Sequence, residues 1–147
     1  LTMFTNQSHE EKLHRVNDCL EKVNLENSNK LSINELSGGM IKRVSIARAI
    51  VMKPRYLLCD EPNSGLDPKT AIIIDNLIQK ITIEGNITTI VNTHDMNSVM
   101  EIGEVIAYIN NGEICWSGSK EELINNNNPE LNNFVFASKL FKRLKRT

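Results

Sequence analysis

The chain has 147 residues, of which 40% are apolar and 24% are charged, and its formal net charge is −1. This length and composition suit a single globular domain with a hydrophobic core of its own. The nearly balanced charge argues against a protein whose main task is binding a nucleic-acid backbone, because phosphate binding normally requires a surplus of basic residues.

The sequence shows no sign of a membrane span or a signal peptide. No run of apolar residues approaches the roughly 18 to 20 that cross a bilayer, and the beginning of the sequence lacks the basic and apolar regions of a signal peptide. The three cysteines, Cys19, Cys59 and Cys115, form no C-x-x-C pair and have no histidine at metal-ligand spacing. We therefore expect them to be reduced and buried in a cytosolic protein, without a disulfide or a zinc site.

The first two predicted elements are helices. Ser8 and Glu11 have the spacing of a capping box, and the apolar residues after them recur at helical spacing. A second helix is expected from Ile41 onward, and Pro54 ends it. The stretch "LSGGM", residues 36–40, lies immediately before this second helix.

A strand, a helix and another strand are predicted next. The run "YLLC" before Asp60 is apolar throughout, which favours a strand buried on both faces of a parallel sheet. Asp67 has the position of an N-cap, Pro68 that of the first helical residue, and Gly85 marks the end of this helix. The run "ITTIVNTH" predicts the second strand, so the polar residues that end both strands should meet at one sheet edge, where α/β proteins bind ligands. The buried face of the helix should consist of Ile73, Ile74, Leu77, Ile78 and Ile81.

The last third of the chain predicts a hairpin and two helices. The runs "VIAYI" and "EICWSG" flank Asn110-Asn111-Gly112, in which Asn-Gly is the strongest short hairpin signal. Ser119 and Glu122 form another capping box, and the asparagine run that ends at Pro129 is expected to be an exposed linker. The final helix is expected to pack its apolar residues on the domain or a partner subunit and to expose its basic residues, the alternative being contact with anionic lipid. Its apolar residues are Phe134, Ala137, Leu140, Phe141 and Leu144, and its basic residues are Lys139, Lys142, Arg143, Lys145 and Arg146.

The segment Ser37-Gly38-Gly39 has the chemistry of an anion site. A helix N-terminus offers unpaired N–H groups and a partial positive charge, so a phosphate group is its natural ligand. The two glycines allow a close approach, and the serine adds a hydroxyl donor. The alternative is a plain N-cap followed by flexible glycines, which the tripeptide alone does not exclude.

Further candidate residues are expected near the shared sheet edge. Asp60 suits a Mg²⁺ ligand that acts through water, and Glu61 suits a base that polarises an attacking water. His94 ends the next strand, close enough to reach the same phosphate. Asp67 lies beside the first strand, where it could couple one site to another as well as cap its helix. The alternatives are an exposed acidic turn for the carboxylates and a structural role for the histidine.

Four motifs resemble those of an ABC-transporter ATPase. In this order and spacing, "LSGGMIKRVSIARAI", "YLLCDEP", "SGLD" and "NTHD" look like its signature motif, Walker B motif, D-loop and switch histidine. The resemblance implies an α/β P-loop NTPase fold, here incomplete, with a parallel sheet, crossover helices, and a C-terminal hairpin and helices. It also implies ATP and Mg²⁺ as ligands, and a homodimer of ATPase subunits in which each ATP lies between the two subunits.

The resemblance also implies a role for each site residue. Glu61 would be the general base, His94 would stabilise the γ-phosphate, and Asp60 would help to hold Mg²⁺. The residues that would contact ATP across the dimer interface are Ser37, Gly38, Gly39, Met40, Ser64, Gly65 and Asp67.

Within the family, Met40 and the phrases "THDMNSVMEIGEVIAYINNGEICWSGS" and "ELNNFVFASKL" look most like the ATPase of Mla-type, MCE-linked phospholipid transporters. This implies a membrane permease, an MCE-domain protein and a STAS-domain protein as partners, at the inner face of the cell membrane, with no nucleic acid involved. The alternatives are an importer ATPase for another solute, an ABC ATPase of chromosome maintenance or DNA repair, and a non-catalytic interaction module. The DNA-related alternative predicts long heptad repeats and a basic surface, and the sequence has neither.

The phosphate-cradling Walker A loop, G-x-x-x-x-G-K-[ST], does not occur among the 147 residues, and the first of them is Leu. We therefore expect residues 1–147 to be the C-terminal portion of one ATPase domain. Its parts would be a helical signature region at about 1–52, a core at about 53–118 and a helical tail at about 119–147. Alone, such a piece should have little ATPase activity.

Overall fold

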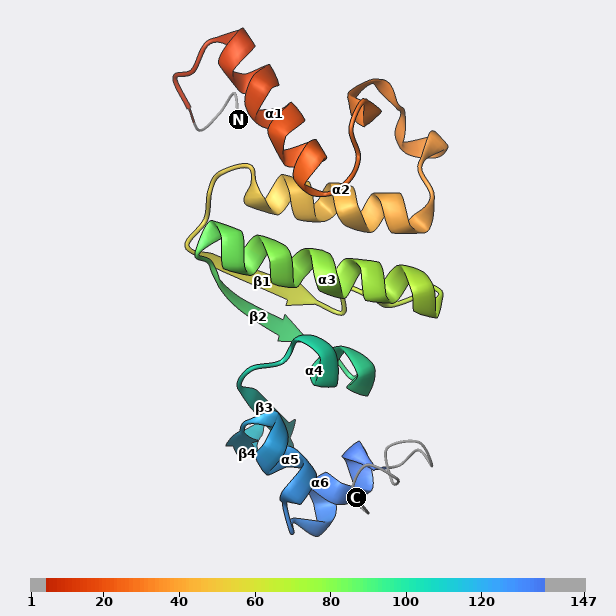
Figure 1. Ribbon diagram of the computed structural model, residues 1–147, viewed down its shortest axis with the longest axis vertical. Helices are drawn as coiled ribbons and strands as arrows, with labels where there is room; N and C mark the ends of the chain where they lie inside the picture. Colours follow the sequence, from red (N-terminus) through yellow and green to blue (C-terminus); the bar gives the residue numbers. More distant parts are fainter. Residues whose placement is uncertain (1–4, 137–147) are drawn as a thin grey trace. The chain divides into compact units, whose positions relative to one another are not determined.

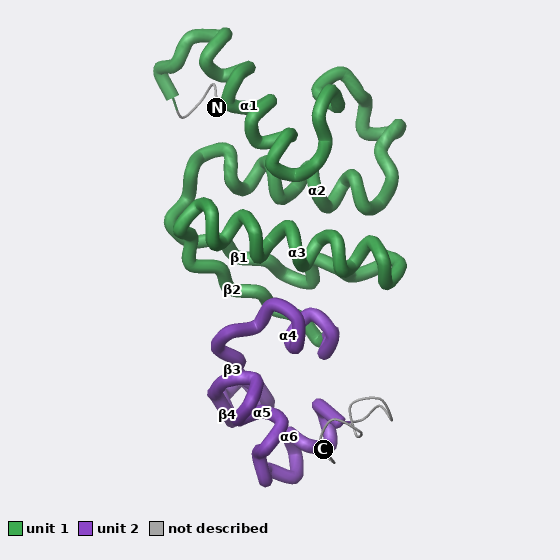
Figure 2. The backbone as a smooth tube through the Cα atoms, in the orientation of Figure 1, with its two compact units in different colours: residues 1–94 green, residues 95–147 purple. Residues whose placement is uncertain are grey.

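The computed structural model describes residues 5–136, which belong to two compact units, residues 1–94 and 95–147 (Figures 1 and 2). The first unit contains α1 (His9–Lys22), the short 3-10 helices η1 (Ser28–Lys30) and η2 (Ile33–Glu35), α2 (Gly38–Ile50), β1 (Tyr56–Asp60), α3 (Pro68–Gly85) and β2 (Thr88–Asn92). The second unit contains α4 (Met96–Ile102), β3 (Ile106–Asn110), β4 (Glu113–Gly118), α5 (Lys120–Asn125) and α6 (Pro129–Val135).

Helices α1 and α2 pack together in the first unit. The capping box predicted at the start of α1 is confirmed, since Ser8 accepts from the Glu11 N–H and the Glu11 carboxylate accepts from the Ser8 N–H. The Arg43 guanidinium of α2 donates to the Asn24 carbonyl, 2.8 Å away, just beyond the end of α1. A cation at this end of a helix is favourable because the last carbonyls carry partial negative charge.

Helix α2 begins three residues before the predicted start at Ile41. The Ser37 hydroxyl accepts from the Met40 N–H at 3.3 Å, so it is an N-cap and Gly38 is the first helical residue. This side-chain cap compensates for the low helix propensity of the two glycines. The predicted end is confirmed, because α2 stops at Ile50, before Pro54.

Strands β1 and β2 form a two-stranded parallel sheet, as the strand–helix–strand order predicted. Leu57 lies opposite Thr89 and Asp60 opposite Asn92, so the two carboxyl ends are level. Helix α3 covers the face of the sheet from which Thr89 hydrogen-bonds Thr82 of α3.

The expectation that β1 is buried on both faces is wrong for the part of the chain that the structure describes. Leu58 in β1 is 73% exposed and Ile90 in β2 is 61% exposed, and both lie on the face opposite α3. One helix can cover only one face of a sheet, and successive side chains of a strand point to opposite faces. The described unit therefore leaves an apolar sheet face open.

Helix α3 begins and ends as predicted. Asp67 is its N-cap, Pro68 is its first residue and Gly85 its last, with Asn86 in the left-handed conformation as C-cap. Ile74, Leu77, Ile78 and Ile81 are buried as expected, but Ile73 is 41% exposed. Consecutive residues of a helix point about 100° apart, so Ile73 and Ile74 do not share the buried face.

The second unit contains the predicted hairpin. Asn111 and Gly112 join β3 and β4 with φ values of +50° and +83°, the left-handed conformation that a type I′ turn requires at both positions. The capping box of Ser119 and Glu122 at the start of α5 is confirmed. The core of this unit is made of Leu123, Leu131, Val135 and Phe136.

Two elements of the second unit differ from the prediction. Helix α4 was not predicted, and Pro129 begins α6 instead of belonging to a linker. Asn128 caps α6 by accepting from the N–H groups of Glu130 and Leu131, so the end of the asparagine run starts a helix. The predicted tail helix beyond Phe136 lies outside the described residues.

The three cysteines are free, and they differ in exposure. Burial raises the pKa of the Cys19 and Cys59 thiols. Cys115, in contrast, is exposed on β4, so the expectation that all three are buried is wrong. The fold therefore separates one accessible thiol from two shielded ones.

We expect a thiol reagent such as iodoacetamide at pH 8 to label Cys115 first. Thiolate is the reactive form, and a raised pKa lowers its fraction at Cys19 and Cys59 while burial restricts access. Mass spectrometry of digested samples over time measures the order, with a urea-unfolded sample as the control. Equal labelling rates in the folded protein would contradict the described burial.

Candidate functional site

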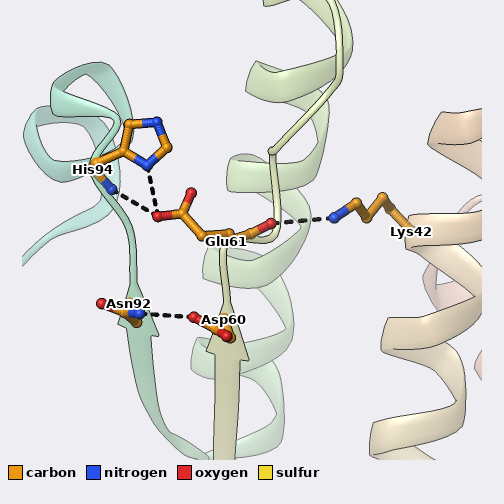
Figure 3. A network of polar contacts seen from close by, with 5 residues as sticks. All are labelled: Lys42, Asp60, Glu61, Asn92 and His94. Atoms are coloured by element: carbon orange, nitrogen blue, oxygen red, sulfur yellow. Dashed lines mark hydrogen bonds and ion pairs between the residues drawn. The ribbon is translucent and has the colours of Figure 1, made fainter.

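The carboxyl ends of β1 and β2 bring together Asp60, Glu61, Asn92 and His94 (Figure 3). The His94 ring Nδ1 lies 2.7 Å from the Glu61 Oε1, and the His94 backbone N–H donates to the same oxygen at 3.1 Å. The Glu61 side chain is 33% exposed and the His94 ring 75% exposed. The predicted meeting of Asp60, Glu61 and His94 at one edge of the sheet is confirmed.

The Glu61 carboxylate has one anchored oxygen and one that faces outward. Oε1 is held by His94, whereas Oε2 makes no hydrogen bond with a described residue. A carboxylate held in this way keeps a fixed orientation and still has an oxygen that can accept a proton from water. The geometry therefore suits a general base.

The backbone at Glu61 is strained. Its φ is +44°, the left-handed region that a non-glycine residue rarely adopts, at a cost on the order of 1–3 kcal/mol. Its N–H donates to the Asn92 carbonyl at 2.9 Å and its carbonyl accepts from the Ser64 N–H at 3.2 Å. These bonds hold a conformation that aims the side chain toward His94.

Asp60 is compatible with a magnesium ion bound through water. Its Oδ1 accepts from the Asn92 side-chain amide at 2.7 Å, and its Oδ2 makes no hydrogen bond with a described residue. Residues 5–136 contain no group of three or more histidine, cysteine, aspartate or glutamate side chains placed to hold a metal. Mg²⁺ does not require one, because it keeps several waters and takes further ligands from substrate phosphates.

The start of α2 presents the "LSGGM" segment at the surface. Ser37 and Gly38 are exposed, while Gly39 and Met40 are half-buried. Because the Ser37 oxygen only accepts from Met40, its own O–H remains able to donate to a ligand. The plain N-cap and the ligand contact are therefore compatible.

The loop between β1 and α3 carries Ser64, Gly65 and Asp67 beside the start of α2. A Cβ atom added at Gly39 would lie 2.8 Å from the Thr70 methyl group in the first turn of α3, so the two helix starts are in close contact. Gly65 has a φ of +78°, which favours glycine. The loop is tied to α3 where the Asn63 amide donates to the buried Asp75 carboxylate at 2.8 Å.

Asp67 caps α3 with both of its carboxylate oxygens. Oδ1 accepts from the N–H groups of Lys69 and Thr70, each at 3.1 Å, and Oδ2 accepts from the Thr70 hydroxyl. The hydroxyl bond and then the backbone bond from Thr70 lower the pKa of the Asp67 carboxyl below its ordinary value. The ionised cap is therefore the form that the fold favours.

We expect Asp67→Asn to lower the melting temperature at pH 7, and this difference to shrink in acid. Since the folded-state pKa of Asp67 is depressed, its contribution is fully present above the ordinary aspartate value near 4 and is lost as the pH falls through the folded pKa. Calorimetry of both proteins from pH 7 to pH 3 measures this. An undiminished difference at pH 3 would show that charge is not the cause.

The sequence did not indicate three of the polar partners at this site, which are Lys42, Asn63 and Asn92. The only signal for Asn92 was its place at the end of the second strand, level with Asp60 once the strands are paired. No local pattern identifies a side chain that reaches a backbone carbonyl of another element.

Several known proteins are similar to this chain. A family profile described as "ABC transporter" matches residues 1–64. The methionine import ATP-binding protein MetN of Campylobacter jejuni is 41% identical over 128 residues, which are 87% of this chain and 38% of the relative. The phosphonates import ATP-binding protein PhnC 2 of Haloarcula marismortui is 37% identical over 113 residues, or 77% and 42% of the two chains. The chain thus spans about two fifths of the length of these relatives.

Two solved structures are similar in shape. The ATP-binding cassette MJ0796, in a dimeric post-hydrolysis state bound to ADP and Pi, has a TM-score of 0.68 and 37% identity, with 79% of this chain and 50% of that chain covered. The ADP conformation of MJ1267, an ATP-binding cassette of an ABC transporter, has a TM-score of 0.73 and 26% identity, with 97% and 54% covered. The chain has, in part, an ABC ATPase fold. The α/β fold class expected from the motifs is confirmed.

These relatives are named as import proteins for methionine and phosphonates, and not for the phospholipid that the Mla-type resemblance implies. Met40, one of the three features on which the lipid interpretation rested, uses its backbone N–H to complete the cap of α2 in this ABC ATPase fold. No helix among the described residues combines the length and apolar composition needed to span a bilayer.

Proposed function

We propose that this chain supplies the general base and the contacts across the dimer interface in the ATP-hydrolysing subunit of an ABC importer. The observation that carries the proposal is the Glu61 carboxylate, with one oxygen held by His94 and the other unbonded, beside Asp60 at the carboxyl ends of β1 and β2. ATP would be the substrate, and a bound Mg²⁺ would neutralise charge on its phosphates.

In the proposed site each side chain has a separate task. Glu61 accepts a proton from the attacking water through Oε2, and His94 fixes Glu61 through Oε1 while its exposed ring contacts the γ-phosphate. Asp60 would hold a bound Mg²⁺ through water by its Oδ2.

The start of α2 would serve the ATP of a second subunit. Ser37 offers its hydroxyl, and Gly38 and Gly39 offer the first N–H groups of a 13-residue helix, to its γ-phosphate, while Met40 follows them and completes the cap. Ser64, Gly65 and Asp67 would lie along the same dimer interface. The dimeric state of a similar solved cassette supports this arrangement.

The proposed partner is a membrane permease, which would bring the subunit to the inner face of the cell membrane. The cargo class that the relatives favour is a small polar solute such as an amino acid or a phosphonate. The Mla-type interpretation, with phospholipid as cargo and MCE-domain and STAS-domain partners, is the competing outcome of the test.

The test is to purify the full-length protein with its associated membrane subunit and reconstitute both into vesicles. We expect Mg²⁺-dependent ATP hydrolysis that is coupled to uptake of a labelled small solute, with L-methionine as the first probe. ATP-dependent movement of fluorescent phospholipid without solute uptake would favour the lipid transporter. A full-length protein that binds ATP but does not hydrolyse it would contradict the enzymatic role.

A further inference from the structure

Lys42 joins α2 to the candidate base. Its ammonium nitrogen Nζ donates to the Glu61 carbonyl oxygen at 3.2 Å, which bridges two elements that lie 19 residues apart in the chain (Figure 3). Lys42 is half-buried, and among the described residues no carboxylate lies within ion-pair distance of its ammonium. Fixing a lysine side chain costs conformational entropy. The hydrogen bond to the Glu61 carbonyl has to offset this cost, whereas a lysine that stays in solvent keeps its freedom.

The carbonyl that Lys42 contacts belongs to a peptide group with no donor of its own. Residue 62 is proline, so the peptide between Glu61 and Pro62 lacks an N–H. Its orientation is therefore held only through the carbonyl oxygen, which accepts from the Ser64 N–H and from Lys42. The Glu61–Pro62 peptide directly follows the Glu61 Cα atom, which is in the left-handed conformation. The orientation of this peptide therefore helps to set the direction of the Glu61 side chain.

Lys42 lies close to the start of α2, which the proposed function places against the ATP of a second subunit. The helix begins at Ser37 and Gly38, and Lys42 follows about one turn later, so a shift of the helix start displaces the lysine as well. Through the hydrogen bond from Lys42, the same movement would reach the Glu61 carbonyl.

We infer that Lys42 is a positioning residue that couples the two ATP sites of the dimer. It links the helix start that contacts the partner's ATP to the base that acts on this subunit's own ATP. This inference rests on the proposed function, because it requires Glu61 to be the base and the start of α2 to contact nucleotide.

The test uses the full-length protein with the substitutions Lys42→Met and Lys42→Arg, and Arg48→Met as the matched control. Arg48 lies on the same helix, is exposed and makes no hydrogen bond with a described residue. We expect Lys42→Met to lower kcat for ATP about tenfold, equivalent to about 1.4 kcal/mol, with KM for ATP within about twofold. Lys42→Arg should recover most of the rate, and Arg48→Met should match the unmodified protein.

A double substitution separates positioning from general destabilisation. In a Glu61→Gln background, Lys42→Met should cause no further loss of hydrolysis, because the group that it positions is already inactive. If Lys42→Met fails to fold, Lys42→Gln, which removes the charge but keeps a polar side chain, is measured by the same criteria.

The outcomes distinguish the two proposals. If Lys42→Met hydrolyses ATP as fast as Arg48→Met while Glu61→Gln is inactive, the role of Lys42 is refuted and the proposed function stands. An equal loss on Lys42→Met in the unmodified and Glu61→Gln backgrounds also refutes positioning. If Glu61→Gln keeps its turnover, the proposed function falls and the inference falls with it.

Discussion

Replacing Glu61 with glutamine should lower ATP hydrolysis at least 100-fold while ATP binding is retained. Positioned general bases contribute about 10²- to 10⁴-fold to a rate, and an amide oxygen is too weak a base to replace the carboxylate. Glutamine has the same shape and still offers an oxygen to the His94 N–H, so the local structure should persist. The full-length Glu61→Gln protein should therefore accumulate as an ATP-bound dimer.

Single-turnover hydrolysis and size-exclusion chromatography in the presence of Mg²⁺ and ATP measure the two effects. Glu26→Gln is the matched control, because Glu26 is exposed and makes no hydrogen bond with a described residue. Turnover at the unmodified rate in Glu61→Gln would remove this residue from the role of base. If Glu61→Gln loses both ATP binding and ATP hydrolysis, the substitution has damaged the structure instead.

Replacing Gly38 with aspartate should abolish most activity without destabilising the fold. A Cβ atom at this position would have Leu66 as its nearest neighbour, at an ordinary contact distance of 3.8 Å. An acidic residue in the first turn of a helix is favourable, so the melting temperature should stay level or rise. The same carboxylate would repel the phosphate that we place at this helix start, and the loss should be at least about 100-fold, or roughly 2.7 kcal/mol.

Gly38→Asn separates charge from size, because asparagine has nearly the shape of aspartate without its charge. We expect Gly38→Asn to retain more ATP-dependent dimerisation and hydrolysis than Gly38→Asp. Equal activity of the aspartate variant and the unmodified protein would show that no phosphate approaches Gly38. Equal losses in both variants would show that bulk alone is responsible.

The elements that the sequence predicted correctly are those whose signals are local. Ser8, Asp67 and Asn111-Gly112 each specify a helix start or a turn through bonds within a few residues. Helix α4 was missed because it is only seven residues long and its N-cap, Asp95, lies in the stretch "NTHD" that resembles a functional motif. The start of α2 was placed three residues late because the two glycines after Ser37 have a low helix propensity.

The contacts of the candidate site depend on strand pairing and were only partly predictable. The sequence indicated that Glu61 and His94 share a sheet edge. It did not indicate that the two side chains touch, because they are 33 residues apart in the chain. The bond between Asp60 and Asn92 follows only from a register that places these two residues opposite each other. The hydrogen bond from Lys42 to the Glu61 carbonyl depends on the packing of α2 against the loop that follows β1, and no sequence pattern indicates it.

The open face of the β1–β2 sheet should make the melting temperature of a polypeptide of these 147 residues depend on protein concentration. Tyr56, Leu58 and Ile90 present apolar surface there, on strands whose sequences carry little charge. Two copies that cover this face for each other are stabilised by mass action, so the melting temperature should rise with concentration and fall on dilution. A dilution series belongs beside each thermal and kinetic experiment on this polypeptide.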